Sequence, residues 1–257
     1  MTKLEILKND IKKLGNLAVA FSGGVDSSLL LKVAADVLGE NVLALTVKSP
    51  YMSLRETDEA VEFAKFYGIR HEVFEVGIAD EIKLNPQNRC YLCKKAVFSR
   101  LLTRAKELGF TNLADGTNKD DLGEYRPGLK AKEELGVLSP LINLRKFEIR
   151  ELSRELNLST AEKPSYACLL TRLPHEKEIS VSDINLVEAA ENLLIKSGYA
   201  NVRARLDDRK MKLQMPFSSM QTFLNDVKFK SIVKELVALG AAEVTLDLKG
   251  LREDVLA

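Results

Sequence analysis

The fold is decided by the apolar run Leu17-Ala-Val-Ala-Phe21 and the residues directly after it, Ser22-Gly-Gly-Val-Asp-Ser-Ser28. The run is typical of a strand buried in a parallel sheet, and residues 26–38 predict a helix that ends at Gly39. Two glycines let the backbone turn tightly and approach a ligand closely. The helix start adds unpaired N–H groups and the positive end of its dipole. Residues 22–28 therefore predict a phosphate-binding loop.

The side chains of this loop indicate which phosphate it binds. Ser22, Ser27 and Ser28 add hydroxyl donors, and Asp26 adds a carboxylate. A carboxylate repels phosphate unless a cation lies between them, so Asp26 is predicted to hold Mg²⁺ on a pyrophosphate. The Gly-Lys-Ser/Thr ending of a Walker A loop and the dinucleotide pattern GxGxxG are both missing. A Ser/Gly-rich turn without a ligand is the alternative interpretation.

Strands and helices alternate through residues 1–170, which predicts an α/β domain with a doubly wound parallel sheet. Strands are expected over residues 17–21, 42–47, 72–76 and 112–115. Helices are expected over residues 4–14, 26–38, 54–67, 90–108 and 146–156, and residues 116–128 read as a polar loop. Ser53 and Glu56 are predicted to form a capping box.

Residues 171–257 predict a smaller α+β domain. A helix over residues 183–196, capped by Ser182, is followed by strands over residues 201–206 and 210–215. One long helix over residues 218–239 and a strand over residues 244–248 complete the predicted order.

The bulk composition is that of an ordinary globular protein. The net charge is +1, from 38 basic and 37 acidic residues, which argues against a dedicated nucleic-acid binder. The first residues are charged and amphipathic, without an apolar signal core. No stretch approaches the roughly 18 uninterrupted apolar residues of a membrane helix. We therefore expect a cytoplasmic protein without a membrane partner.

The chain has three cysteines, of which Cys90 and Cys93 form a Cys-x-x-Cys pair and Cys168 stands apart. In a cytosolic protein this spacing suggests metal or redox chemistry more than a structural disulfide. Three thiolates leave one iron of a 4Fe-4S cluster open, since such a cluster normally takes four. An open iron could hold an extra sulfide. Neighbouring basic side chains would favour the thiolates, and these are Arg89, Lys94 and Lys95.

Other interpretations of the cysteines remain open. Zinc could be held by the three thiols together with His175, as a Cys₃His site. One cysteine could instead carry a persulfide that another resolves as a disulfide. A lone cysteine is most often a small buried apolar residue.

Residues 22–28 resemble the SGGxDS motif of the PP-loop ATP pyrophosphatases, whose fold is of the adenine nucleotide alpha hydrolase type. This resemblance implies that ATP is cleaved between its α and β phosphates and that a carboxylate or carbonyl is adenylated. It also implies that the strand ending at Val47 lies against the adenine, and that Val25, Gly23 and Gly24 line the ATP site.

A second resemblance covers nearly the whole chain. The matching stretches are residues 22–28, Asn88-Arg-Cys-Tyr-Leu-Cys-Lys-Lys95, Asp115-Gly-Thr-Asn-Lys-Asp-Asp121, Arg126-Pro-Gly128, Ser139-Pro-Leu141, Lys163-Pro-Ser-Tyr-Ala-Cys168, Asn201-Val-Arg-Ala-Arg205 and residues 244–252. These are similar to the LarE family of ATP-dependent sulfur transferases, which act in the synthesis of the nickel-pincer nucleotide cofactor.

The LarE resemblance implies a substrate, pyridinium-3,5-biscarboxylic acid mononucleotide, whose carboxylates are adenylated with MgATP and converted to thiocarboxylates. Some members sacrifice the sulfur of one cysteine, at the position of Cys168. Members with three cysteines, as here, are thought to use a 4Fe-4S cluster that delivers sulfide. The family also implies a homo-oligomer, a hexamer.

The same resemblance implies roles for particular residues. Arginines near the substrate are Arg172, Arg203, Arg205 and Arg252. Asp115, Asn118 and Asp121 would shape the nucleotide side of the cleft and Gly116 would line the ATP site, although an Asp-Gly-rich loop is more often a plain turn. Lys94 or Lys95 would stabilise charge at the adenylate.

The sequence departs from the family after the last cysteine. The family often carries Ala-Ser-Arg-Ile-Pro-Tyr-Gly, where this chain has Leu169-Leu-Thr-Arg-Leu-Pro-His175. Arg172 and Pro174 survive, but the small residues and the aromatic do not.

Two other enzymes and a sensor are the rival interpretations. The 4Fe-4S tRNA thiolases carry a loop that resembles SGGKDS, with Lys at the position of Val25. An amide-forming synthetase such as NAD synthetase would leave the cysteines unexplained. A metal sensor would not need an intact phosphate loop.

Overall fold

The computed structural model describes residues 1–123 and 127–251. The chain forms two compact units, Met1–Ile82 with Asn88–Lys163, and Lys83–Gln87 with Pro164–Ala257. The short segment Lys83–Gln87 thus belongs with the second unit although it lies within the sequence of the first. The domain ranges 1–170 and 171–257 stay a prediction.

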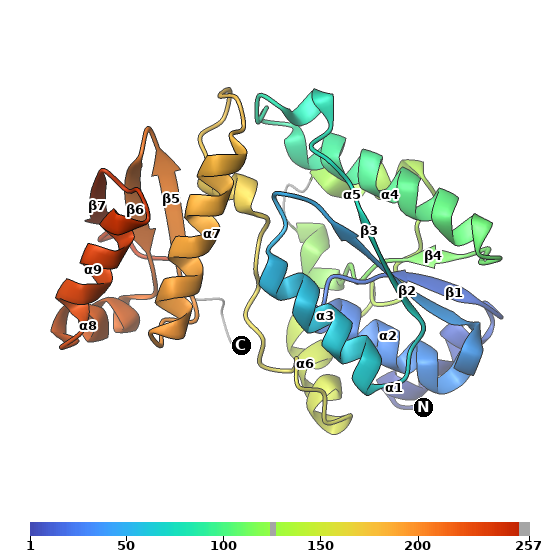
Figure 1. The fold of residues 1–257 in the computed structure, drawn as a ribbon. Helices are drawn as coiled ribbons and strands as arrows, with labels where there is room; N and C mark the ends of the chain where they lie inside the picture. The colour runs from blue at the N-terminus through green and yellow to red at the C-terminus, as the bar shows by residue number, and fades with distance from the viewer. Residues whose placement is uncertain (124–126, 252–257) are drawn as a thin grey trace. The chain divides into compact units, whose positions relative to one another are not determined.

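A parallel sheet forms the centre of the first unit (Figure 1). It contains β1 (Leu17–Ala20), β2 (Val42–Lys48), β3 (His71–Glu75) and β4 (Leu113–Ala114), in the order β3-β2-β1-β4. Successive side chains of a strand point to opposite faces. Accordingly Leu17 and Val19 pack into one apolar cluster, and Ala18 into another. Both faces are therefore covered, which confirms the predicted doubly wound α/β fold.

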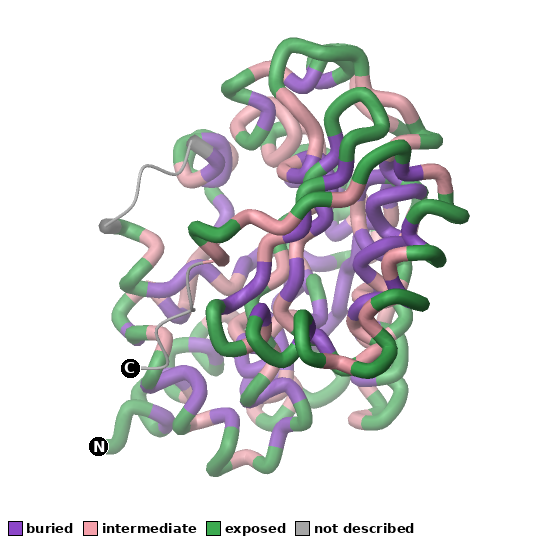
Figure 2. The backbone as a smooth tube through the Cα atoms, turned by 90° about the vertical axis from the view of Figure 1, so that its left-hand side faces the viewer, coloured by how far each residue is buried: buried purple, intermediate pink, exposed green. Residues whose placement is uncertain are grey.

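Helices cover both faces of this sheet. The apolar sides of α1 (Lys3–Lys12), α2 (Val25–Leu38), α3 (Leu54–Phe66) and α6 (Lys146–Glu155) join the cluster on one face. The other cluster is formed with α4 (Arg89–Glu107), against which α5 (Pro127–Glu134) packs. Short 3₁₀ turns occur at η1 (Gly39–Asn41), η2 (Asp80–Ile82) and η3 (Lys119–Gly123). Figure 2 shows how buried and exposed stretches alternate along the chain.

Two local expectations for the first unit are wrong. Residues 116–128 were expected as a polar loop, but they contain η3 and the start of α5, where proline occupies the first helical position that suits it. Ser53 does precede α3, yet its hydroxyl makes no capping hydrogen bond. Glu56 does not complete a capping box, because its carboxylate is paired with Lys163.

The second unit contains a three-stranded sheet of β5 (Arg203–Asp207), β6 (Lys210–Gln214) and β7 (Glu243–Leu246). β5 and β6 are antiparallel, and β6 and β7 are parallel. The helices of this unit are α7 (Val181–Lys196), α8 (Phe217–Asn225) and α9 (Phe229–Ala238), with the 3₁₀ turn η4 (Leu169–Arg172). This mixture confirms the predicted α+β class.

Two expectations for the second unit are also wrong. The long helix over residues 218–239 is divided into α8 and α9, because the Asp226 carboxylate ends α8 by accepting hydrogen bonds from the Lys228 amide and the Tyr199 hydroxyl. Ser180, not Ser182, precedes α7, and the two hydroxyls are hydrogen-bonded to each other. Within the described ranges, no helix combines the length and the apolar character needed to span a bilayer.

Candidate active site

The predicted phosphate loop connects β1 to α2. Gly23 has φ +71°, in the left-handed region that favours glycine, and a Cβ there would lie 3.1 Å from the Ala60 Cβ on α3. Gly24 precedes α2 and offers no side-chain cap. The first N–H groups of α2 are therefore left to a ligand or to solvent, which suits an anion.

The serines give this loop a defined internal structure. Ser27 Oγ donates to the Gly24 carbonyl (3.2 Å) and accepts from the Ser22 amide (3.3 Å). The Ser28 hydroxyl is fully buried, and no residue within the described ranges is hydrogen-bonded to it. A buried hydroxyl without a partner is costly, and a phosphate oxygen is one group that would satisfy it.

The loop after β4 lies directly against the phosphate loop. A Cβ on Gly116 would lie 2.9 Å from the Ser27 amide nitrogen and 3.0 Å from the Asp26 Cβ. Gly116 does not have a positive φ, so glycine is needed here for space and not for backbone conformation. The two predicted stretches, residues 22–28 and 115–118, therefore meet at one place.

Asp26 is held by two side chains. Its Oδ1 accepts from Asn118 Nδ2 (3.1 Å), and its Oδ2 is paired with Lys146 Nζ at the start of α6 (2.5 Å). The ion pair is partly exposed, so water and Mg²⁺ have access to it. Sequence analysis missed Lys146, since nothing in its surroundings distinguishes it from a solvated helix residue.

Asp115 fixes the loop after β4 through contacts with three side chains. Its oxygens accept from Ser139 Oγ (2.7 Å) and Thr117 Oγ1 (2.6 Å), and Lys132 Nζ lies 3.6 Å away. Lys132 also donates to Ser139 Oγ (2.5 Å). Asp115 and Lys132 are both buried, so this network fixes the backbone that carries Gly116.

Two of the cysteines lie near the start of α4. Residues three apart lie on the same side of a helix, so Cys90 and Cys93 can act on one ligand. Cys90 is exposed and Cys93 half-buried, with its Sγ 3.2 Å from the buried Tyr51 hydroxyl. Tyr51 is a second residue that sequence analysis missed.

The basic residues after Cys93 have partners of their own. Lys95 Nζ donates to the Tyr91 hydroxyl and to Glu134 on α5, both at 3.1 Å, and these bonds raise the pKa of Lys95. The stem of Lys94 packs against Gly128. Val47, expected near the adenine, lies in the apolar cluster between β2 and α4.

Cys168 lies in the second unit, directly before η4, and is half-buried. The Arg172 guanidinium holds the backbone on either side of it, donating to the Ala167 carbonyl (2.9 Å) and the Cys168 carbonyl (3.3 Å). Arg172 is itself fixed by a fully buried ion pair with Glu191 on α7 (2.8 Å). Arg172 thus contacts the Cys168 segment through its backbone carbonyl groups.

Two further arginines lie against the same segment. Arg203 donates to the Ser165 carbonyl (2.7 Å), and its guanidinium lies 5.1 Å from the centre of the Tyr166 ring. Arg205 donates to the Thr171 carbonyl (2.6 Å). The fourth predicted arginine, Arg252, lies outside the described residues, as does Arg126.

The three cysteines carry sulfur donors, which suit an iron–sulfur cluster or zinc. Over residues 1–123 and 127–251, no three His, Cys, Asp or Glu side chains are gathered as a metal site. Cys90 and Cys93 lie three residues apart on α4, a spacing at which two thiols can face one ligand. His175, the fourth zinc ligand considered above, shares a hydrogen bond through Nδ1 with the Asn85 carbonyl (3.1 Å).

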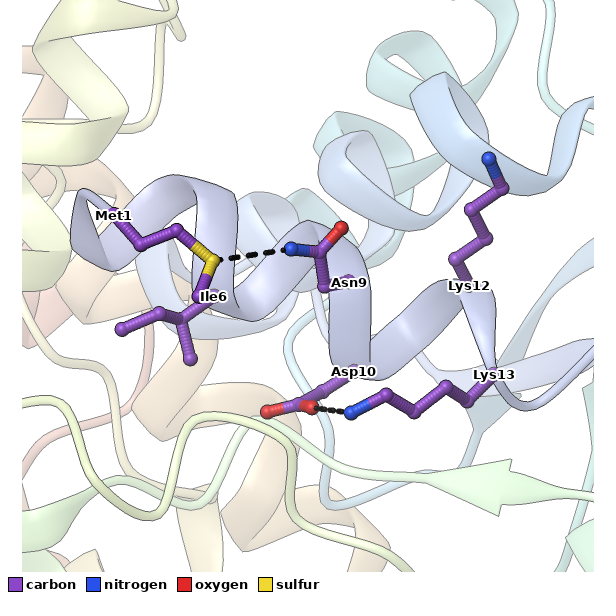
Figure 3. Close-up of a pocket in the computed structure, with 6 residues that line it drawn as sticks. All are labelled: Met1, Ile6, Asn9, Asp10, Lys12 and Lys13. Atoms are coloured by element: carbon purple, nitrogen blue, oxygen red, sulfur yellow. Dashed lines mark hydrogen bonds and ion pairs between the residues drawn. The ribbon is translucent and has the colours of Figure 1, made fainter.

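A surface hollow at the N-terminus is unrelated to these residues. It is lined by Met1 and by side chains of α1 and its end, and contains none of the predicted site residues (Figure 3). Its walls include an exposed ion pair between Asp10 and Lys13.

The parallel sheet and the loop between β1 and α2 define an ATP-using enzyme of the PP-loop class. The family model for NAD synthase matches residues 2–100, the part that carries this loop. Pyridinium-3,5-bisthiocarboxylic acid mononucleotide synthase of Lactiplantibacillus plantarum is 35% identical over 98% of this chain and 92% of its own length.

Two proteins of unassigned function are similar over the same extent. Protein slr1717 of Synechocystis is 39% identical over 97% of this chain and 94% of its own length. Protein MJ0830 of Methanocaldococcus jannaschii is 33% identical over 97% of both chains. The chain belongs to the LarE family of PP-loop ATP-dependent sulfur transferases.

Proposed function

We propose that this enzyme converts the carboxylates of pyridinium-3,5-biscarboxylic acid mononucleotide to thiocarboxylates at the expense of ATP, as a step in nickel-pincer nucleotide synthesis. The Lactiplantibacillus relative is a synthase of pyridinium-3,5-bisthiocarboxylic acid mononucleotide, the product that this reaction would give, and this supports the proposed substrate. The ATP chemistry is supported by the phosphate loop itself. Gly116 packs against the Ser27 amide, and the buried Ser28 hydroxyl has no hydrogen-bond partner among the described residues.

In the first step, a substrate carboxylate oxygen attacks the α phosphorus of ATP. The bond from that phosphorus to the bridging oxygen breaks, and pyrophosphate leaves while the acyl adenylate forms. The first amides of α2 and the serine hydroxyls would hold the pyrophosphate. Asp26 would hold Mg²⁺, and Lys146 would then exchange its carboxylate partner for the nearby phosphates.

In the second step, sulfide attacks the acyl carbon and AMP leaves, so that the carboxylate oxygen is lost with AMP and sulfur takes its place. A 4Fe-4S cluster held by Cys90, Cys93 and Cys168 would supply this sulfide. The pair of cysteines on α4 supports that assignment, and zinc or a thiol relay at the same residues are its alternatives. Lys94 and Lys95 would contribute positive charge near the adenylate.

The arginines would recognise the acidic nucleotide substrate. Guanidinium groups suit phosphate and carboxylate. Arg203 and Arg205 on β5 donate to the Ser165 and Thr171 carbonyls, which lie on either side of Cys168 in the chain. Arg172 would support this recognition through its hydrogen bonds to the backbone at Cys168. Arg252 would add a further positive charge. We further propose a cytoplasmic homo-oligomer, a hexamer, which light scattering of the purified protein would measure.

The decisive experiment is mass spectrometry of the small molecules after anaerobic incubation of iron-reconstituted protein with MgATP, sulfide and the biscarboxylated nucleotide. We expect exchange of oxygen for sulfur, with AMP and pyrophosphate released and more than one turnover per protein molecule. A single turnover in which Cys168 loses its sulfur would refute the cluster. Absence of exchange in protein that binds ATP and carries its cluster would refute the substrate, and tRNA would be tested next.

A further inference from the structure

Lys163 makes three polar contacts at the back of the phosphate loop. Its ammonium donates to the Gly23 carbonyl (2.9 Å) and pairs with two carboxylates of α3, Glu59 (2.6 Å) and Glu56 (3.3 Å). The side chain is only 13% exposed. A lysine ammonium has three hydrogens, and these three acceptors account for all of them.

The bond to Gly23 sets the orientation of a peptide that the ligand would meet. In a trans peptide the C=O and the following N–H point in opposite directions. Since Lys163 draws the Gly23 carbonyl to one side, the Gly24 N–H points to the other, toward Ser22 Oγ inside the loop (3.4 Å). Glycine at φ +71° has no intrinsic preference that would keep this orientation.

The lysine is itself held firmly. The buried Arg150 on α6 donates to the Lys163 carbonyl (3.1 Å) and to the Ala161 carbonyl (2.5 Å). Glu56 and Glu59 are affected differently: burial raises the pKa of Glu56, whereas at Glu59 burial is outweighed by the contacts with Lys163 and Arg55 together, which lower its pKa. Lys163 thus joins α3, α6 and the loop.

We propose that Lys163 is a positioning residue of the phosphate loop: it fixes the Gly23–Gly24 peptide so that its N–H faces the pyrophosphate. Lys163 is also the last residue of the first unit, and residues 164–167 lead from it directly to Cys168. Pyrophosphate binding would therefore restrain the start of the segment that carries this cysteine. The inference rests on the proposed use of the loop for ATP.

The first test is calorimetric binding of inorganic pyrophosphate, with Mg²⁺, to the full-length protein. Lys163→Met is expected to raise the Kd at least tenfold, while the Tm without ligand changes by only a few degrees. The matched control is Arg154→Met, which removes an exposed ion pair with Glu162 beside the same segment and leaves the loop untouched. Its Kd is expected to equal that of the wild type.

If Lys163→Met does not fold, the role of Lys163 is tested with the milder variant Glu59→Gln. Glu59→Gln removes one charge partner of Lys163 from a half-exposed position, and should raise the Kd about threefold. In addition, saturating pyrophosphate should slow hydrogen exchange of residues 160–168 in the wild type and in Arg154→Met, less in Glu59→Gln, and not in Lys163→Met.

The outcomes separate this inference from the proposed function. A wild-type protein that does not bind pyrophosphate refutes the use of the loop, and the inference with it. Binding in the wild type that is unchanged in Lys163→Met, or in Glu59→Gln where the former is unfolded, refutes only the role of Lys163.

Discussion

At the scale of single residues, Asp26 shows how a carboxylate can be kept ready for a cation. Asn118 and Lys146 hold the two oxygens of this proposed Mg²⁺ ligand, and Asp26 is partly exposed, so the proposed exchange of the ammonium for Mg²⁺ would take place within reach of solvent. The carboxylate is thus oriented in advance of the ligand, which lowers the entropy lost on binding.

Asp26→Asn is expected to weaken the apparent affinity for Mg²⁺ in ATP–pyrophosphate exchange on the order of 100-fold. The amide has nearly the same shape and can still be hydrogen-bonded to Asn118, so the Tm should remain close to that of the wild type. Exchange with an unaltered Mg²⁺ requirement would show that Asp26 is not a metal ligand.

His71 is connected through Thr46 to Phe21, the residue before the phosphate loop, and its protonation state therefore affects that connection. Its Nε2 is hydrogen-bonded to Thr46 Oγ1 (2.8 Å), and that hydroxyl donates to the Phe21 carbonyl (2.7 Å). The hydroxyl has one hydrogen, so His71 must donate from Nε2. Burial lowers the pKa of His71 from its ordinary 6.5, because the cation would lose its hydration.

The pH dependence of stability follows from this lowered pKa. Stability from neutral His71 is fully present above pH 6.5 and is lost as the pH falls through the lowered pKa, because the unfolded chain then binds the proton more readily. We expect the free energy of unfolding, measured in urea, to fall more steeply below pH 6.5 in the wild type than in His71→Gln, whose amide can donate to Thr46. Parallel pH curves would contradict the assignment.

At the scale of elements, the site depends on the close approach of the loops after β1 and β4. These strands are neighbours in the sheet, and the carboxyl ends of parallel strands meet at one edge. Gly116 is the point of contact, and the network of Asp115, Lys132 and Ser139 holds it there.

Gly116→Ala is expected to lower stability by about 1–3 kcal/mol, because the new methyl group would overlap the Ser27 amide. It should also weaken pyrophosphate binding, since the Ser27 amide belongs to the loop. Gly77→Ala is the control: Gly77 does not have a positive φ, and a Cβ there would meet nothing within 4 Å. Equal losses in both variants, by urea unfolding and calorimetry, would refute the packing argument.

The elements that carry the site were predictable, and the contacts between them were not. Apolar runs such as Leu17–Ala20 and Val42–Lys48 reveal buried strands, and the glycines of the loop reveal the turn. Lys146 and Lys163 meet residues far away in the chain, at Asp26 and Gly23. Such pairs leave no periodic signal, because each lysine alone looks like a solvated surface residue.

Local polar competition explains the other misses. Ser53 and Ser182 were expected to cap helices, but Glu56 is drawn to Lys163, and Ser182 is bonded to Ser180. Asp226 ends α8 because a tertiary hydrogen bond from Tyr199 and a local one from the Lys228 amide outweigh the helical pattern of residues 218–239. In each case a partner that the pattern does not contain decides the local structure.

At the scale of the whole molecule, the division into units does not follow the order of the chain. Asn85, from the segment Lys83–Gln87, donates to the carbonyls of Leu173 (3.2 Å) and Pro174 (2.8 Å) in the second unit. The Ile179 amide donates to the Lys83 carbonyl (2.7 Å). The turn that follows Cys168 is therefore supported by residues from much earlier in the sequence.

A fragment of residues 164–257 is accordingly expected to be less stable than the same fragment with residues 83–87 joined to its N-terminus through a flexible linker. The added peptide supplies donors to the part-buried carbonyl groups of Leu173 and Pro174. Thermal unfolding by circular dichroism measures the difference, and the fused fragment carrying Asn85→Ala is the control. Equal melting of all three fragments would show that the segment is dispensable.

The placement of Lys83–Gln87 also bears on how the enzyme is made. A growing polypeptide leaves the ribosome from its N-terminus, so this short stretch emerges long before the residues it will join. Its partners arrive only when translation has passed Pro164. The nascent protein must therefore keep these residues accessible until then, and the turn after Cys168 reaches its final structure late in synthesis.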